Sequence, residues 1–184
     1  MASGGEGSAL RLVEDEDLVE ALQNADQEVF ETMVFTACDP ATVDESGLDP
    51  GVHVDGHHVD SGTGEAQFTQ FEIDAEVGFT GELNGRVLLR CSAEGAMDIA
   101  RGLLMLGDAD AIDIAEAADA LGECANMVTG VVKTRMLDPI GHFDLSIPKI
   151  NSNPQLSGKA RAGTLAYKLK QGIIAVEVWV DSTD

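Results

Sequence analysis

Aromatic residues are scarce in this 184-residue chain, where Phe, Trp and Tyr together make up 4%. Basic residues are also few, with 11 Lys and Arg against 33 Asp and Glu, for a formal net charge of −22. Such a field repels phosphate backbones and anionic lipid surfaces, so we expect neither a nucleic acid nor a membrane as partner. The acidic residues crowd the first two thirds, since 28 of the 33 precede residue 126. A salt-adapted host and a basic partner would each explain this composition.

Long apolar runs are absent as well: stretches such as GIIAV and GLLML fall far below the roughly 18 residues that a membrane helix needs. The amino terminus lacks the basic and apolar regions of a secretory signal. The three cysteines, Cys38, Cys91 and Cys124, follow no disulfide or zinc pattern and fit reduced thiols. We therefore expect a cytoplasmic protein with one domain over residues 9–184, preceded by a flexible tail over 1–8.

Apolar periodicity alternates between helix and strand along the chain. Helical spacing predicts a long helix over 13–34, a shorter one over 93–106 and a second long one over 110–136. Strand patterns cover 68–76, a hairpin over 78–92 with Asn84-Gly85 as its two-residue turn, 143–150, and a pair over 163–170 and 171–180. This order predicts an α+β fold with two long helices packed on a largely antiparallel sheet.

Residues 39–66 hold two prolines, five glycines and three of the four histidines, and we expect a long loop or arm there. His53, His57 and His58 lie near Asp55 and Asp60, so a metal site has to be weighed. The spacing matches no helix-borne metal motif, and glycines surround the histidines. A polar loop without metal is the favoured interpretation.

The most informative stretch lies in the second long helix, DALGECANMVTGVVKTRM. A helical projection puts an apolar face on one side, made of Ala115, Ala118, Leu121, Ala125, Val128, Val132 and Met136. Asp119, Glu123, Asn126 and Gly130 lie opposite, with Lys133 at the edge of this row. A solvated helix face explains acidic residues there, but Asn and Gly are poor helix formers. Their presence favours a surface that something approaches closely.

These residues resemble a known family. Asp119-x-x-x-Glu123-x-x-Asn126, followed by Met127, Gly130 and Lys133-Thr134, is similar to the signature of the CheC/CheX/FliY phosphatases of bacterial and archaeal chemotaxis. VFETM in the first helix, VGFTGELNGRVLLRCS and FDLSIPKI also look CheX-like, so the resemblance runs from about residue 10 to 180. The first helix offers Glu28-x-x-Glu31 without Asn, which matches the CheX arrangement with one motif per chain. Val131 departs from the asparagine that many relatives carry.

The resemblance implies hydrolysis of the aspartyl phosphate on a CheY-like receiver domain in two-component signalling. It implies that Asn126 positions the attacking water and that Glu123 docks the receiver's lysine, with Asp119, Gly130 and Lys133 as partner contacts. It implies no cofactor of the chain's own, Mg²⁺ on the receiver, and a homodimer. Cys124 as a nucleophile would need a basic neighbour, which this acidic helix does not offer. The alternatives are a non-catalytic receiver-binding or flagellar-switch module, and a scaffold whose acidic arm binds a basic partner.

Overall fold

The computed structural model describes residues 28–33, 39–41, 71–151, 156 and 159–181. Within this part the elements are, in order, η1 (Val29–Met33), β1 (Asp39–Ala41), β2 (Ile73–Gly81), β3 (Gly85–Cys91), α3 (Ala93–Leu103), α4 (Ile114–Val132), η2 (Lys133–Leu137), β4 (Phe143–Leu145), β5 (Lys149–Ile150), β6 (Lys159–Lys168) and β7 (Ile173–Asp181). η1 and η2 are single π-helical turns. The expected tail over 1–8 and most of the helix expected over 13–34 lie outside the described residues.

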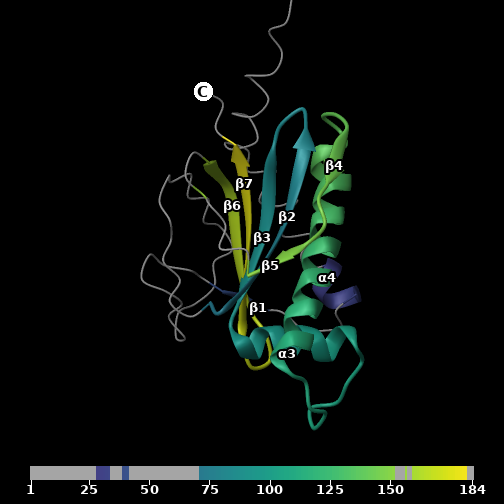
Figure 1. Ribbon diagram of the computed structural model, residues 1–184, viewed down its shortest axis with the longest axis vertical. Helices are drawn as coiled ribbons and strands as arrows, with labels where there is room; N and C mark the ends of the chain where they lie inside the picture. Colours follow the sequence, from purple (N-terminus) through teal and green to yellow (C-terminus); the bar gives the residue numbers. More distant parts are fainter. Residues whose placement is uncertain (1–27, 34–38, 42–70, 152–155, 157–158, 182–184) are drawn as a thin grey trace, which may run out of the picture.

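Seven described strands form one antiparallel sheet in the order β1-β6-β7-β3-β2-β4, with β5 also paired to β2 (Figure 1). Ile73, Ala75 and Val77 of β2 alternate toward the core, as the period of two predicts. β6 and β7 form the expected carboxy-terminal hairpin. The predicted α+β fold, with helices on a largely antiparallel sheet, is confirmed.

Two predictions about loops are wrong. Asp39–Ala41 form a short strand, β1, paired to β6, so these three residues do not belong to the loop or arm expected over 39–66, whose residues 42–66 lie outside the described part. The β2–β3 reversal is longer than the expected two-residue turn, because Gly85 already pairs with Phe79 and with Val180. Gly85 is required by crowding in the sheet, since a Cβ there would lie 2.2 Å from the Trp179 carbonyl oxygen.

The helices begin where side chains cap them. Asp113 accepts hydrogen bonds from the backbone N–H groups of Ala115 and Glu116, and Glu116 accepts one from the Asp113 N–H, which completes a capping box. This cap starts α4 four residues later than predicted. Ser92 caps α3 by accepting from the Gly95 N–H at 3.1 Å. The carboxy-terminal end of the long helix, predicted at 136, is formed by η2.

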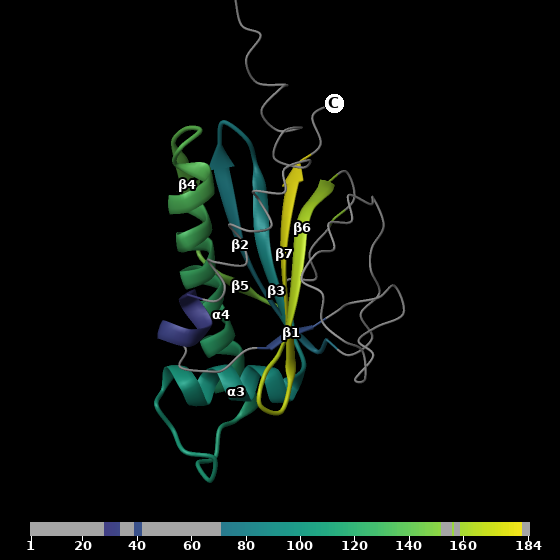
Figure 2. The ribbon, with the colours of Figure 1, turned by 180° about the vertical axis from the view of Figure 1, so that it is seen from behind.

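Figures 1 and 2 show α4 running along one face of the sheet, with α3 crossing below its amino-terminal end and η1 beside it. Leu121, Ala125, Val128 and Val132 are completely buried, as the helical projection predicts. Ala115 is exposed and Ala118 only half-buried, contrary to that projection. The first turn of α4 is exposed throughout, and burial begins at Ala117, because a projection assumes that every turn is covered alike.

Contacts at two places fix the helices to the sheet. Phe30 of η1 packs on Tyr167 of β6 with ring centroids 5.8 Å apart. At α3, the buried Asp98 carboxylate accepts hydrogen bonds from the N–H groups of Gln171 (2.6 Å) and Gly172 (3.2 Å) in the β6–β7 turn. Gly172 needs to be glycine because a Cβ would lie 2.0 Å from the Gly95 nitrogen. These contacts hold the β6–β7 turn directly against α3.

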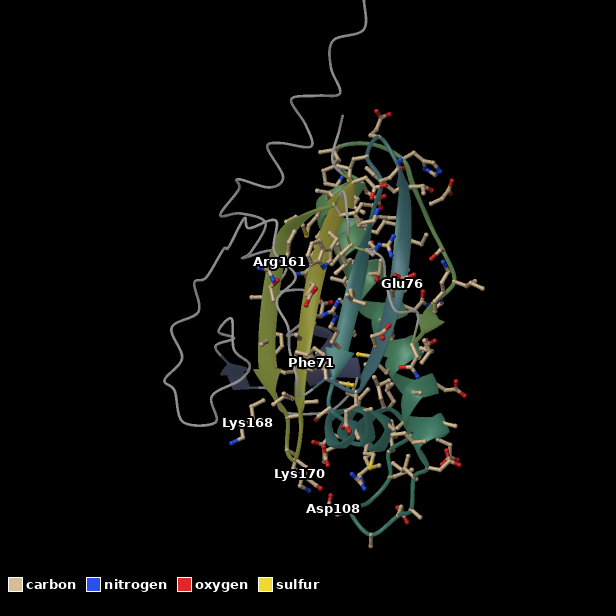
Figure 3. The ribbon with its side chains drawn as sticks, turned by 60° about the vertical axis from the view of Figure 1, so that its left-hand side comes forward. Phe71, Glu76, Asp108, Arg161, Lys168 and Lys170 are labelled. Atoms are coloured by element: carbon tan, nitrogen blue, oxygen red, sulfur yellow. The ribbon has the colours of Figure 1, made fainter. Side chains whose placement is uncertain are left out.

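The other face of the sheet, turned forward in Figure 3, carries charged side chains, and no helix of the described residues covers it. Arg86 bonds Glu76 at 2.6 Å, and Trp179 donates to Glu177 at 2.7 Å. Arg161 lies 5.7 Å from the Trp179 ring centre. These contacts pair charged groups with partners on strands whose opposite sides are apolar, although the buried Arg86 Nε and Glu177 Oε1 atoms have no hydrogen-bond partner in the described part of the chain. The described helices include none that is long and apolar enough to span a membrane.

Candidate functional site

One row of α4 faces away from the sheet along the whole helix. Asp119, Glu123 and Asn126 are exposed, and Gly130 is half-exposed one turn further on. Spacings of three and four residues place them one above the other on a single side. Within the described part of the chain, no residue forms a hydrogen bond or an ion pair with the side chain of Glu123 or Asn126. Nothing in the described part of the chain therefore occupies these two side chains.

The opposite side of the same turns holds this row in place. Cys124, Ala125 and Val128 have no exposed surface, and Thr129 is buried with its hydroxyl donating to the Ala125 carbonyl at 2.7 Å. A Cβ added at Gly122 would lie 2.8 Å from Ile150 Cδ1 of β5, so the helix lies close against the sheet edge there. Because packed neighbours fix the backbone, Glu123 and Asn126 project from a rigid support.

The two glycines of α4 differ in what surrounds them. Gly122 is buried and lies against Ile150 and Pro148, so its lack of a side chain has a packing reason. A Cβ at Gly130 would meet nothing within 4 Å. Glycine within a helix costs about 1 kcal/mol relative to alanine. Contacts within the described part of the chain give no reason for that cost at Gly130.

Lys133 lies at the end of the row, but its ammonium is not free. Its Nζ bonds Asp138 Oδ1 at 2.6 Å across η2. The π turn brings these residues together, because the Asp138 N–H also donates to the Lys133 carbonyl at 2.8 Å, five residues back. The Thr134 hydroxyl donates to the Gly130 carbonyl at 3.0 Å. The row that the sequence predicts thus ends in an internal ion pair.

Neither described cysteine is placed for nucleophilic chemistry. Cys124 is completely buried on the side of α4 opposite to the exposed row. Burial, together with the carboxylates of Asp74 and Glu72, raises the pKa of Cys91 to about 12. Among the described residues, no group of three or more His, Cys, Asp and Glu side chains could hold a metal ion. His53, His57 and His58 lie outside the described residues.

Sequence reasoning missed one exposed apolar cluster, where α3 leads into α4. The expected helix over 93–106 is shorter, because α3 ends at Leu103 and Met105 takes a positive φ of 53°. Leu104, which lies within that expected helix, is 54% exposed. The only signal was the apolar run LLML before a glycine, and this run equally fits a buried helix end.

The exposed row of α4 thus lies on a helix that is supported by an antiparallel sheet. The model of the family described as chemotaxis phosphatase CheX matches residues 73–169, which include β2, α4 and β6. This chain belongs to the CheX family. No curated protein matches it in sequence.

Solved structures agree in fold. The chemotaxis protein CheX of Vibrio vulnificus superposes with a TM-score of 0.60 at 16% identity, covering 89% of this chain and 95% of that one. The CheX of a CheX–CheY–BeF3–Mg²⁺ complex from Borrelia burgdorferi gives 0.59 at 18% identity, covering 89% and 97%. FliY of Thermotoga maritima gives 0.53 at 15% identity, covering 100% and 93%. These likenesses concern the fold.

Proposed function

We propose that this protein hydrolyses the aspartyl phosphate of a CheY-like receiver domain. The observation that carries the proposal is the exposure of Glu123 and Asn126 on neighbouring turns of a rigid helix, with no described partner for either side chain. Membership of the CheX family supports it. So does the existence of a relative that was solved in complex with CheY, BeF3 and Mg²⁺.

The reaction needs little from a second protein. Water attacks the phosphorus, the bond to the aspartyl oxygen breaks, and carboxylate, inorganic phosphate and a proton are released. An acyl phosphate is already reactive, and the receiver would bring its own Mg²⁺, so we propose no cofactor for this chain. The contribution left is to hold the water in line with the phosphorus.

Asn126 suits that task because its amide is neutral and its carbonyl oxygen accepts a hydrogen bond from water. Glu123 carries a negative charge that a phosphoryl group would repel, so it is better suited to pair with the receiver's lysine. Asp119 lies one turn before it and would face the same partner. Gly130 leaves the helix backbone open to close approach. Lys133 would contact the partner only after breaking its ion pair with Asp138, so we expect it to contribute least to binding.

The test is phosphate release from a phosphorylated CheY-like receiver at substoichiometric amounts of this protein. A catalyst accelerates release under these conditions, whereas a receiver-binding module changes it only stoichiometrically. Asn126→Ala should lower the rate about a hundredfold while binding is kept, because the group that orients water is gone. Equal rates for Asn126→Ala and the wild type would contradict the role of Asn126. Asn126→Asp keeps the size and adds a charge facing the phosphate, so it should also be slow.

Glu123→Ala should weaken binding, and the loss should be greatest at low salt, where the charge pairing is least screened. Glu94→Ala is the matched control, since Glu94 is an exposed helix carboxylate on α3. An effect of Glu123→Ala that does not change with salt would contradict pairing with a lysine. The proposal includes a homodimer with one site per chain, which mass measurement in solution tests.

A further inference from the structure

The exposed apolar cluster between α3 and α4 has no role in the site described above. Leu104, Met105 and Leu106, here called the apolar cap, are 54%, 78% and 37% exposed, and Ile114 in the first turn of α4 is 51% exposed. Only two other large apolar side chains of the described part, Ile140 and Ile147, are exposed. Single exposed apolar residues are ordinary, but a contiguous group marks a surface that binds something.

The apolar cap has a defined backbone geometry. The Met105 N–H donates to the Gly102 carbonyl at 3.1 Å and the Leu106 N–H to the Arg101 carbonyl at 2.9 Å, which is the double hydrogen bond of a Schellman helix end. The residue with positive φ in this motif is usually glycine, yet here it is Met105. The chain thus places its most exposed large side chain of the cap at a position where a side chain is unfavourable.

The first residues of the connection that follows, Gly107 to Asp110, are held by side-chain contacts. Asp108 binds the Lys170 ammonium through both carboxylate oxygens at 2.6 Å, and Figure 3 shows the two side chains together at one end of the molecule. The Gly107 N–H donates to Asp110 at 2.7 Å. Lys170 belongs to the turn that Asp98 holds against α3. A surface held in this way loses little conformational entropy when a partner binds.

The charges around the apolar cap select the chemistry of the partner. Asp110, Asp113 and Glu116 follow it in the connection and in the first turn of α4, where they are exposed and carry negative charges. The nearby cations are engaged, since Arg101 lies 3.8 Å from Asp98 and Lys170 binds Asp108. A complementary surface therefore offers an apolar pocket with a basic rim.

Only residues 107–113 separate the apolar cap from α4 along the chain. The first turn, from Asp113 to Glu116, is exposed throughout and leads to Asp119 and Glu123. From Asp113 to Asn126 the helix rises about 20 Å, at 1.5 Å per residue, whereas a small domain is about 30 Å across. One domain that covers Asn126 can therefore also reach the amino-terminal end of α4, where the connection from the apolar cap arrives.

We propose that the apolar cap is a second docking contact for the receiver domain and sets affinity, whereas Asn126 acts on the bound phosphate. This rests on the proposed function. The decisive variant is Met105→Gly, which removes the side chain and puts the favoured residue at the positive φ, so folding is preserved. Its KM for the phosphorylated receiver should rise about tenfold, with kcat within twofold of the wild type.

The matched control is Met105→Leu, which keeps an apolar side chain at the same position and should retain most of the affinity. The effect of Met105→Gly should persist at high salt, because apolar contacts are not screened, in contrast to the effect of Glu123→Ala.

Direct binding separates this inference from the proposed function. The probe is a CheY-like receiver held in its activated form by BeF3 and Mg²⁺, titrated against wild type and Met105→Gly. If the wild type binds without accelerating phosphate release, catalysis is refuted, and a tenfold weaker binding of Met105→Gly still supports the apolar cap. Equal affinity of the two proteins overturns the inference. So does a wild type that does not bind, or a Met105→Gly variant whose only change is loss of the dimer.

Discussion

The two sides of α4 are formed by the same turns but differ in burial. On the sheet side, Leu121, Ala125 and Val128 are completely buried, and Gly122 lies against Ile150. On the opposite side, Glu123 and Asn126 are exposed with no described partner. A buried side chain is held by many contacts, so changing it alters stability, whereas an exposed one contributes little to stability. The contrast implies that stability and activity can be altered separately within one helix.

The largest effect is expected on the buried side. Leu121→Ala removes a completely buried side chain from between α4 and the sheet and leaves a cavity. We expect the free energy of unfolding to fall by about 2–5 kcal/mol. Denaturant unfolding followed by circular dichroism measures it. A loss below about 1 kcal/mol would show that the site collapses easily and that the two sides differ less than their burial indicates.

The two glycines of α4 sharpen the comparison, because the same change can be made at both. Gly122→Leu forces a side chain into the space of Ile150 and should cost about 1–3 kcal/mol of unfolding free energy. Gly130→Leu enters open space and improves helix propensity, so it should stabilise the protein by about 0.5–1 kcal/mol.

Activity should respond in the opposite order. Gly130→Leu should weaken the interaction with the receiver, because a side chain would fill the space that a partner approaches, whereas the folded fraction of Gly122→Leu should retain it. Thermal unfolding and receiver titration of the same two samples test this. Gly130→Leu with unchanged affinity would mean that the partner does not come near this turn.

The smallest effect is expected at an ion pair in water. Lys170, by hydrogen bonding and charge, lowers the pKa of the Asp108 carboxyl below its ordinary value. The pair therefore stabilises the fold above the unfolded-state pKa, and this contribution is lost as pH falls through the lower folded-state pKa. Because both groups are exposed, the contribution is small. In Lys170→Ala, NMR titration should show the Asp108 pKa rising toward its ordinary value. An unchanged pKa would mean that the pair does not form in solution.

Much of this protein follows from local rules that the sequence carries. The spacing of Asp119, Glu123 and Asn126 places them on one side of any α-helix, whatever surrounds it. The apolar period likewise determined that Leu121, Ala125 and Val128 face the core, and the period of two determined the strands of the sheet. These properties depend on backbone geometry alone.

Other properties depend on which neighbours cover each turn, and only the tertiary structure decided them. Ala115 and Leu104 fit the apolar pattern but are exposed, because burial begins beyond the first turn of α4 and α3 ends before the pattern does. Lys133 meets Asp138 through a π turn, a spacing that α-helical rules do not predict. Gly85, Gly122 and Gly130 are the same letter in the sequence. Their surroundings differ: Gly85 is crowded by a neighbouring strand, Gly122 touches a side chain, and Gly130 faces open space. These surroundings depend on how distant parts of the chain pack, so the sequence alone does not reveal them.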